Sequence, residues 1–138
     1  MLDDTDKKII KELKQDGRMT MKELGERVHL TGQAAANRVL KLEEEGIIEG
    51  YTIRMNRQKA GDAVQAFIHI FTKTMDHYPL MQFMDQHRHV ILNSYRISGE
   101  GCYLIEVAFP SNTELDEFLQ ELNRHANYRV SIVISKQF

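Results

Sequence analysis

The side chains best suited to chemistry lie between residues 31 and 41, on the outward side of a predicted helix. Glutamine and asparagine can pair bidentately with adenine, and arginine can pair with guanine or with a phosphate. An alanine methyl can meet a thymine methyl, and a lysine can reach a backbone phosphate. This chemistry predicts contact with double-stranded DNA. The candidate DNA-binding residues are Thr31, Gln33, Ala34, Asn37, Arg38 and Lys41.

Residues 20–42 have the spacing of a helix-turn-helix motif, which can hold these side chains out toward a major groove. A helix is predicted to begin at Thr20, whose hydroxyl caps it while Glu23 completes a capping box. The helix cannot run past residues 29–31, and Thr31 is a natural N-cap for the next helix. The same spacing also fits a small helical bundle with a solvated polar face, so the motif alone leaves that alternative open.

A further helix is predicted over residues 3–15, capped by Asp3 or Asp4 and ended by Gly17. Three short helices bury little surface individually, so they must pack on one another to form a domain over residues 1–50. The residues predicted to make its core are Ile9, Leu13, Leu24, Val28, Leu30, Val39 and Leu42, with Ile47 and Ile48 completing it. Residues 50–56 alternate in the manner of a strand, and residues 51–62 are predicted to be a linking strand and hinge.

From residue 63 onward the periodicity indicates strand, helix, strand, strand, helix and strand. Asp76 is expected to cap the first of these helices, and Ser111 with Glu114 forms a second capping box. The βαββαβ order predicts a ferredoxin-like domain over residues 63–138, with both helices on one face of an antiparallel sheet. The fold class is therefore α+β, with an N-terminal three-helix domain.

The strand that begins at Val64 carries apolar side chains on both faces, because Phe67 and Phe71 alternate with Ala66 and Ile68. Helices can cover only one face of this sheet, and a bare aromatic face usually marks a partner surface. We expect self-association as a two-fold dimer. Such a dimer carries two helix-turn-helix domains, which match two half-sites spaced by about one helical turn of DNA or a multiple of it.

Composition excludes several other classes of protein. The net charge of the whole chain is −2, which is unusual for a nucleic-acid binder. The charge is unevenly distributed, however, because residues 18–42 hold five basic residues against two acidic ones. No apolar run reaches the length of a membrane span, and no signal peptide opens the chain. The single cysteine, Cys102, agrees with a reducing compartment. We expect a cytoplasmic, nucleoid-associated protein with no membrane partner.

Neither a metal site nor an active site is predicted. Six histidines are present, but no cysteine or carboxylate cluster at ligand spacing joins His87 and His89. The sequence lacks a nucleophile paired with a base, paired carboxylates and a glycine-rich phosphate loop, so we expect no enzymatic activity and no cofactor.

The sequence as a whole resembles the Lrp/AsnC family of feast/famine transcriptional regulators. The resemblance spans essentially the whole chain and is carried by LDDTDKKIIKELKQDGRMTMKELGERVHLT, NRVLKLEEEGIIEGYT and ISGEGCYLIEV. It implies a winged helix-turn-helix domain, a linking strand, and a βαββαβ domain that dimerises and often builds octamers. It also implies a small effector such as an amino acid, bound between dimers near one hairpin turn. The residues of that turn are Ser98, Gly99, Glu100, Gly101 and Cys102.

Three positions depart from the family pattern. His29 stands where the family favours glycine in the turn, and Gly32 stands where proline often opens the recognition helix. Residues 99–102, Gly-Glu-Gly-Cys, replace the usual Gly-Asp-aromatic-Asp, so we expect either a changed effector or none. The predicted function is a sequence-specific DNA-binding transcriptional regulator. The alternative is an architectural protein that wraps or bridges DNA with weak sequence preference and no effector.

Overall fold

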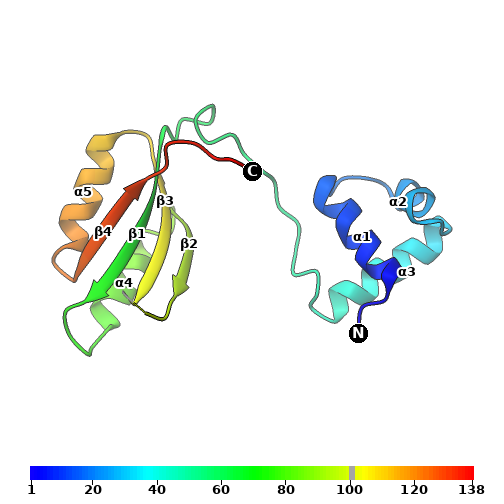
Figure 1. Cartoon of the computed structure of the whole chain (residues 1–138), viewed down its shortest axis with the longest axis horizontal. Coiled ribbons are helices and arrows are strands. Elements are labelled where there is room, and N and C mark those ends of the chain that lie inside the picture. The colour runs from blue at the N-terminus through cyan, green and yellow to red at the C-terminus, as the bar shows by residue number, and fades with distance from the viewer. Residues whose placement is uncertain (100–101) are drawn as a thin grey trace. The chain divides into compact units, whose positions relative to one another are not determined.

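The computed structural model describes residues 1–99 and 102–138 and divides the chain into two compact units, residues 1–54 and 55–138 (Figure 1). The first unit contains only helices, whereas the second combines helices with a sheet. Within the described residues, no helix is long and apolar enough to cross a membrane.

The first unit is built from three helices whose N-cap residues are those that the sequence predicts, but Glu23 does not complete the predicted capping box with Thr20, since its carboxylate pairs with Arg27. The side chains of Asp3, Thr20 and Thr31 each accept a hydrogen bond from the backbone N–H three residues further along. Such caps satisfy amide groups that the helix itself leaves without partners. The helices are α1 (Asp4–Gln15), α2 (Met21–Val28) and α3 (Gly32–Glu44).

The core of the first unit largely matches the prediction. Ile9 and Leu24 are completely buried, and Met19, which the sequence reading missed, is also buried. Ile48 packs against the core as a partly buried residue, but Ile47 is 41% exposed. The buried residues of this core are Ile9, Met19, Leu24, Val28, Ala35, Val39 and Leu42.

The linking strand predicted over residues 50–56 is not formed, because this segment has no regular secondary structure. Its side chains alternate as a strand would, yet Tyr51 and Ile53 are 55% and 75% exposed. A strand needs a hydrogen-bonded neighbour, and no described part of this chain pairs with residues 50–56. The segment continues into a turn in which the N–H of Asp62 donates to the carbonyl of Arg57.

The second unit has the ferredoxin-like order, as predicted. Its elements are β1 (Val64–Thr72), α4 (Tyr78–Gln86), β2 (Ile91–Arg96), β3 (Tyr103–Phe109), α5 (Asn112–Leu122) and β4 (Ala126–Ile132). The strands form one antiparallel sheet in the order β2-β3-β1-β4, so the two strands of the central pair, β1 and β3, are far apart in sequence.

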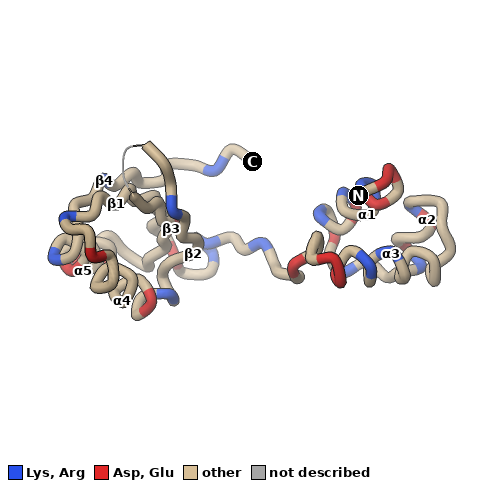
Figure 2. Tube along the Cα trace, turned by 90° about the horizontal axis from the view of Figure 1, so that it is seen from below, with Lys and Arg blue, Asp and Glu red and all other residues tan. Residues whose placement is uncertain are grey.

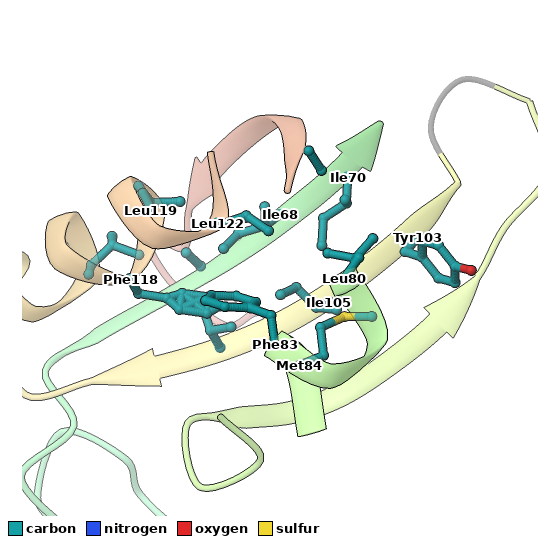
Figure 3. Packing of buried hydrophobic residues seen from close by; sticks show 14 of the residues in the cluster. Ile68, Ile70, Leu80, Phe83, Met84, Tyr103, Ile105, Phe118, Leu119 and Leu122 are labelled. Carbon is teal, nitrogen blue, oxygen red and sulfur yellow. The ribbon is translucent and has the colours of Figure 1, made fainter. Parts of the chain in front are cut away.

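Both helices of this unit pack on the same face of the sheet, and the core lies between the two layers (Figure 3). Ile68 and Ile70 of β1 are fully buried there. Phe83 of α4 meets Phe118 of α5 with ring centroids 5.1 Å apart, which joins the two helices above the strands (Figure 3). Burial of these side chains supplies most of the driving force for folding.

Two predicted caps in this unit differ from the structure. His77, not Asp76, occupies the N-cap position of α4, and its side chain makes no capping hydrogen bond. The carboxylate of Asp76 accepts from the N–H of Tyr78. Ser111 occupies the N-cap position of α5, but its hydroxyl makes no capping hydrogen bond. Sequence position alone does not fix the rotamer of a short polar side chain, and these helices are held by their buried faces.

The face of the sheet opposite the helices carries apolar side chains that neither helix covers. Phe67 of β1 stands between Glu106 of β3 and Ser131 of β4 on this face. Tyr95 of the edge strand β2 is 53% exposed, and it pairs with Leu104 on the same side. We call this surface, centred on Phe67 and Tyr95, the open sheet face.

Candidate nucleic-acid interface

Helix α3 presents one buried side and one exposed side. Ala35, Val39 and Leu42 are buried in the core of the first unit. Gln33 and Asn37 lie on the opposite side, both exposed, and Nε2 of Gln33 donates to the side-chain oxygen Oδ1 of Asn37 at 3.2 Å. An exposed pair of amides on one helix face can offer donors and acceptors to base edges in a major groove.

The remaining predicted DNA-binding residues lie at different places around α3. Thr31 and Lys41 are exposed, and Ala34 is half-buried. The Thr31 hydroxyl is already used as the N-cap, since it accepts from the N–H of Ala34 at 3.1 Å. Lys41 has a side chain that is 74% exposed and lies 4.0 Å from Glu45, so its ammonium group remains open to solvent.

Acidic residues limit the basic surface to the first three turns of α3. Figure 2 shows aspartate and glutamate gathered at the C-terminal end of this helix and in the segment after it. These residues are Glu43, Glu44, Glu45 and Glu49, all of them exposed. A phosphate backbone would be repelled by these carboxylates, so a duplex is favoured against the first three turns of α3, which include Lys41.

Arg38 differs from the other predicted residues because its guanidinium group is engaged within the protein. Its Nη1 donates to the carboxylate of Asp3 at 2.6 Å and to that of Asp6 at 3.2 Å. These hydrogen bonds, that to Asp3 first, raise the pKa of Arg38 above its ordinary value. The sequence did not predict this contact, because 35 residues separate Arg38 from Asp3 and no local pattern links them.

Leu40 is a further candidate that the sequence reading missed. Its side chain is 53% exposed, three residues beyond Asn37 on α3. Residues three apart on a helix are neighbours, so Leu40 extends the exposed amide surface with an apolar group. The sequence could have indicated this residue, because Leu40 is apolar but does not fit the helical spacing of the buried residues Ala35, Val39 and Leu42.

The turn between α2 and α3 depends on the backbone conformation of His29 and on the absence of a side chain at Gly25. His29 ends α2 with φ 60° and ψ 44°, the left-handed conformation that glycine most readily adopts. Histidine therefore adopts the backbone conformation of this turn, although the family favours glycine there. At Gly25 a Cβ atom would lie 2.5 Å from the carbonyl oxygen of Leu30, so the turn folds closely over a position that has no side chain.

The predicted effector turn lies beyond the strand pair β2 and β3 in the second unit. Ser98 and Gly99 are exposed, and Gly99 has φ 84°. Glu100 and Gly101 lie outside the described residues. Cys102 is half-buried, and its Sγ lies 3.2 Å from Oγ1 of Thr72.

Two interactions affect the Cys102 thiol. The hydrogen bonds with Thr72, followed by the positive charge of Arg96, lower the pKa of Cys102 below its ordinary value. A thiol in this position is only a weak hydrogen-bond donor and acceptor. The acidic residue that the family resemblance places there would be a charged and stronger acceptor. The structure thus describes three of the five predicted turn residues, Ser98, Gly99 and Cys102.

His87 of the second unit makes local contacts within the helical layer. Nδ1 of His87 lies 2.7 Å from the carbonyl of Phe83, and Nε2 lies 3.3 Å from a carboxylate oxygen of Glu121. These contacts tie the end of α4 to α5. Within residues 1–99 and 102–138, no group of three or more histidine, cysteine or carboxylate side chains is placed to hold a metal ion.

Comparison with known proteins covers both units. A family model described as winged helix-turn-helix DNA-binding matches residues 2–49, and one described as the Lrp/AsnC ligand binding domain matches residues 65–137. The chain is 50% identical to the HTH-type transcriptional regulator LrpA of Bacillus subtilis, a match that covers 99% of this chain and 100% of the relative.

Solved structures agree with this result over the whole chain. B. subtilis LrpC superposes with a TM-score of 0.92 at 30% identity, covering 99% of this chain and 96% of the other. A transcriptional regulator of Neisseria meningitidis, solved as a complex with L-Met, superposes with a TM-score of 0.89 at 27% identity. That match covers 100% of this chain and 93% of the other.

Proposed function

The chain belongs to the Lrp/AsnC family of transcriptional regulators, and from this membership we propose that the exposed side of α3 reads operator DNA. Gln33 and Asn37 are the base-reading residues, Lys41 contacts a backbone phosphate, and Leu40 meets thymine methyl groups. The supporting observation is that these side chains are exposed on α3 while the opposite side is buried in the core.

Substitutions on α3 separate base reading from phosphate contact. The Asn37→Ala variant is expected to lose about 1 to 3 kcal/mol of operator affinity and to relax sequence preference. The Lys41→Ala variant is expected to weaken binding to all sequences and to lower the slope of log affinity against log salt by about one. Gel shifts on operator and scrambled DNA, repeated across salt concentrations, measure both effects.

A matched control is Lys11→Ala, which removes one exposed lysine from α1 of the same unit. This variant is expected to keep the wild-type slope. Equal wild-type affinities for operator and scrambled DNA would instead favour the architectural role, in which the protein wraps or bridges DNA with weak sequence preference.

We propose that two copies associate through the open sheet face and that dimers assemble further to an octamer. Support comes from Phe67 and Tyr95, large aromatic side chains that are 37% and 53% exposed on a face that neither helix covers. A two-fold dimer places two copies of α3 on one duplex, which suits two half-sites about one turn apart.

We further propose that the second unit binds a small amino-acid effector near residues 98–102. The match to a ligand binding domain supports this role, as does the L-Met complex of the Neisseria relative. Cys102 stands where the resemblance expects an acidic residue, so we propose an effector different from that of the typical family member. A rise in melting temperature with one of the twenty amino acids is expected, and no rise with any of them would contradict the proposal.

This role leaves the protein without an enzymatic activity or a bound cofactor, because the two matched domains account for DNA and effector binding. We propose that it acts in the cytoplasm, associated with the nucleoid.

A further inference from the structure

Two carboxylates from the start of the chain converge on one arginine of the recognition helix. Nη1 of Arg38 lies 2.9 Å and 2.6 Å from the two carboxylate oxygens of Asp3, and 3.2 Å from Oδ1 of Asp6. The contact joins the first turn of α1 to the middle of α3, across the short first unit. It is the longest-range ion pair, in sequence separation, among those in the described part of this unit.

Hydrogen bonds to the backbone of α1 hold the carboxylates of Asp3 and Asp6 in place independently of Arg38. The N–H of Asp6 donates to Oδ1 of Asp3 at 2.8 Å, and the N–H of Asp3 donates to Oδ2 of Asp6 at 3.3 Å. This reciprocal capping box orders both side chains, and the hydrogen bond from Asp6 lowers the pKa of Asp3 ahead of the effect of Arg38. An ion pair between ordered groups loses less side-chain entropy than an ordinary surface pair.

The place of Arg38 on α3 explains what the contact can do. Arg38 directly follows the exposed Asn37 and precedes the buried Val39, so it lies at the border between the reading side and the core side. Its side chain is 36% exposed, whereas that of Lys41 is 74% exposed. A tether at this border can act together with the buried side of α3 to hold the rotation of the helix about its own axis, and with it the direction of Gln33 and Asn37.

We propose that Arg38 is a positioning residue, which stays on Asp3 and Asp6 when DNA is bound and aims the reading side of α3. This inference rests on the proposed role of α3 in reading DNA. If Arg38 has this role, two acidic residues, Asp3 and Asp6, are needed for full affinity toward DNA, although their charge alone would repel a polyanion. The opposing model is that Asp3 and Asp6 sequester Arg38 until a phosphate draws it away.

The two models predict effects of opposite sign for the double variant Asp3→Asn/Asp6→Asn. Asparagine keeps the capping function at these positions but removes both charges. If Arg38 is a positioning residue, operator affinity falls, by about fivefold when about one molecule in five keeps α3 in the orientation that fits the groove. If the carboxylates only repel DNA or sequester Arg38, operator affinity rises.

The matched control is Asp4→Asn, which removes one charge from the same first turn of α1 at an exposed position. This variant is expected to bind operator at least as tightly as wild type. Affinities are measured at a temperature at which circular dichroism shows every variant to be folded, so a loss of affinity does not arise from unfolding.

The Arg38→Met variant provides the second test, since methionine keeps an unbranched apolar side chain but removes the charge. We expect weaker operator binding with an unchanged salt slope, because no phosphate contact is lost. A slope lowered by about one, or tighter binding by Asp3→Asn/Asp6→Asn, would overturn the inference. Failure of the proposed function is distinguishable from either result, because wild-type protein would then show no preference for operator DNA.

Discussion

Replacing Gly25 by alanine is expected to destabilise the first unit by about 3 kcal/mol and to abolish DNA binding. The new Cβ atom would lie 2.5 Å from the carbonyl oxygen of Leu30 and 2.9 Å from that of Thr31. Both oxygens belong to the backbone of the helix-turn-helix turn, so the turn itself has to move. A unit of this size has little stability to lose, and residues 1–54 are expected to unfold on mild heating.

Thermal unfolding followed by circular dichroism, together with gel shifts, measures this effect. Gly50→Ala is the matched control, because a Cβ atom there meets nothing within 4 Å and the backbone does not have a positive φ. That variant is expected to behave as wild type. A Gly25→Ala protein with wild-type melting and DNA binding would mean that the close approach does not constrain the turn.

Replacing Phe67 by arginine is expected to convert the protein to a monomer at micromolar concentration. Phe67 lies at the centre of the open sheet face, between Glu106 and Ser131 of the neighbouring strands. The substitution removes the apolar contact with a second copy, and a guanidinium group buried there loses its hydration, a cost of several kcal/mol that pairing with the adjacent Glu106 offsets only in part. Operator affinity should fall as well, because one α3 can occupy only one half-site.

Sedimentation of the full chain tests this result. The control is Tyr78→Arg, which places the same charge at an aromatic residue that is 64% exposed on α4, in the helical layer. We expect this control to leave the dimer intact. Association of the Phe67→Arg variant with wild-type strength would locate the interface elsewhere on the molecule.

The elements that the sequence predicts well are those defined by local rules. Thr20 and Thr31 each begin a helix at the expected residue, because a capping hydroxyl reaches an amide only three positions away. The strand β1 was identified by its alternation, and Ile68 and Ile70 are fully buried as that alternation requires. The order of strands and helices then determined the ferredoxin-like fold.

What the sequence could not predict depends on distant contacts. The engagement of Arg38 by Asp3 requires α1 and α3 to be placed beside each other, and no local pattern encodes that placement. The prediction of a linking strand was wrong for a related reason. The alternation around Ile53 is typical of a strand, but it does not show whether a neighbouring strand is present to form hydrogen bonds with it. For the effector turn, the residue types at 98–102 indicated a binding site through the family resemblance. The contacts that these residues make with an effector stay a prediction.

The most direct test of the account is chemical protection of operator DNA from methylation by dimethyl sulfate in the presence of the full-length protein. Guanine N7 faces the major groove and adenine N3 faces the minor groove, so the pattern reports which groove α3 occupies. The account predicts that α3, lying in the major groove, covers guanine N7 atoms in two clusters separated by about one helical turn or a multiple of it, and that the Asn37→Ala variant at the same protein concentration protects them more weakly. Protection confined to adenine N3, or an Asn37→Ala pattern identical to wild type, would contradict it.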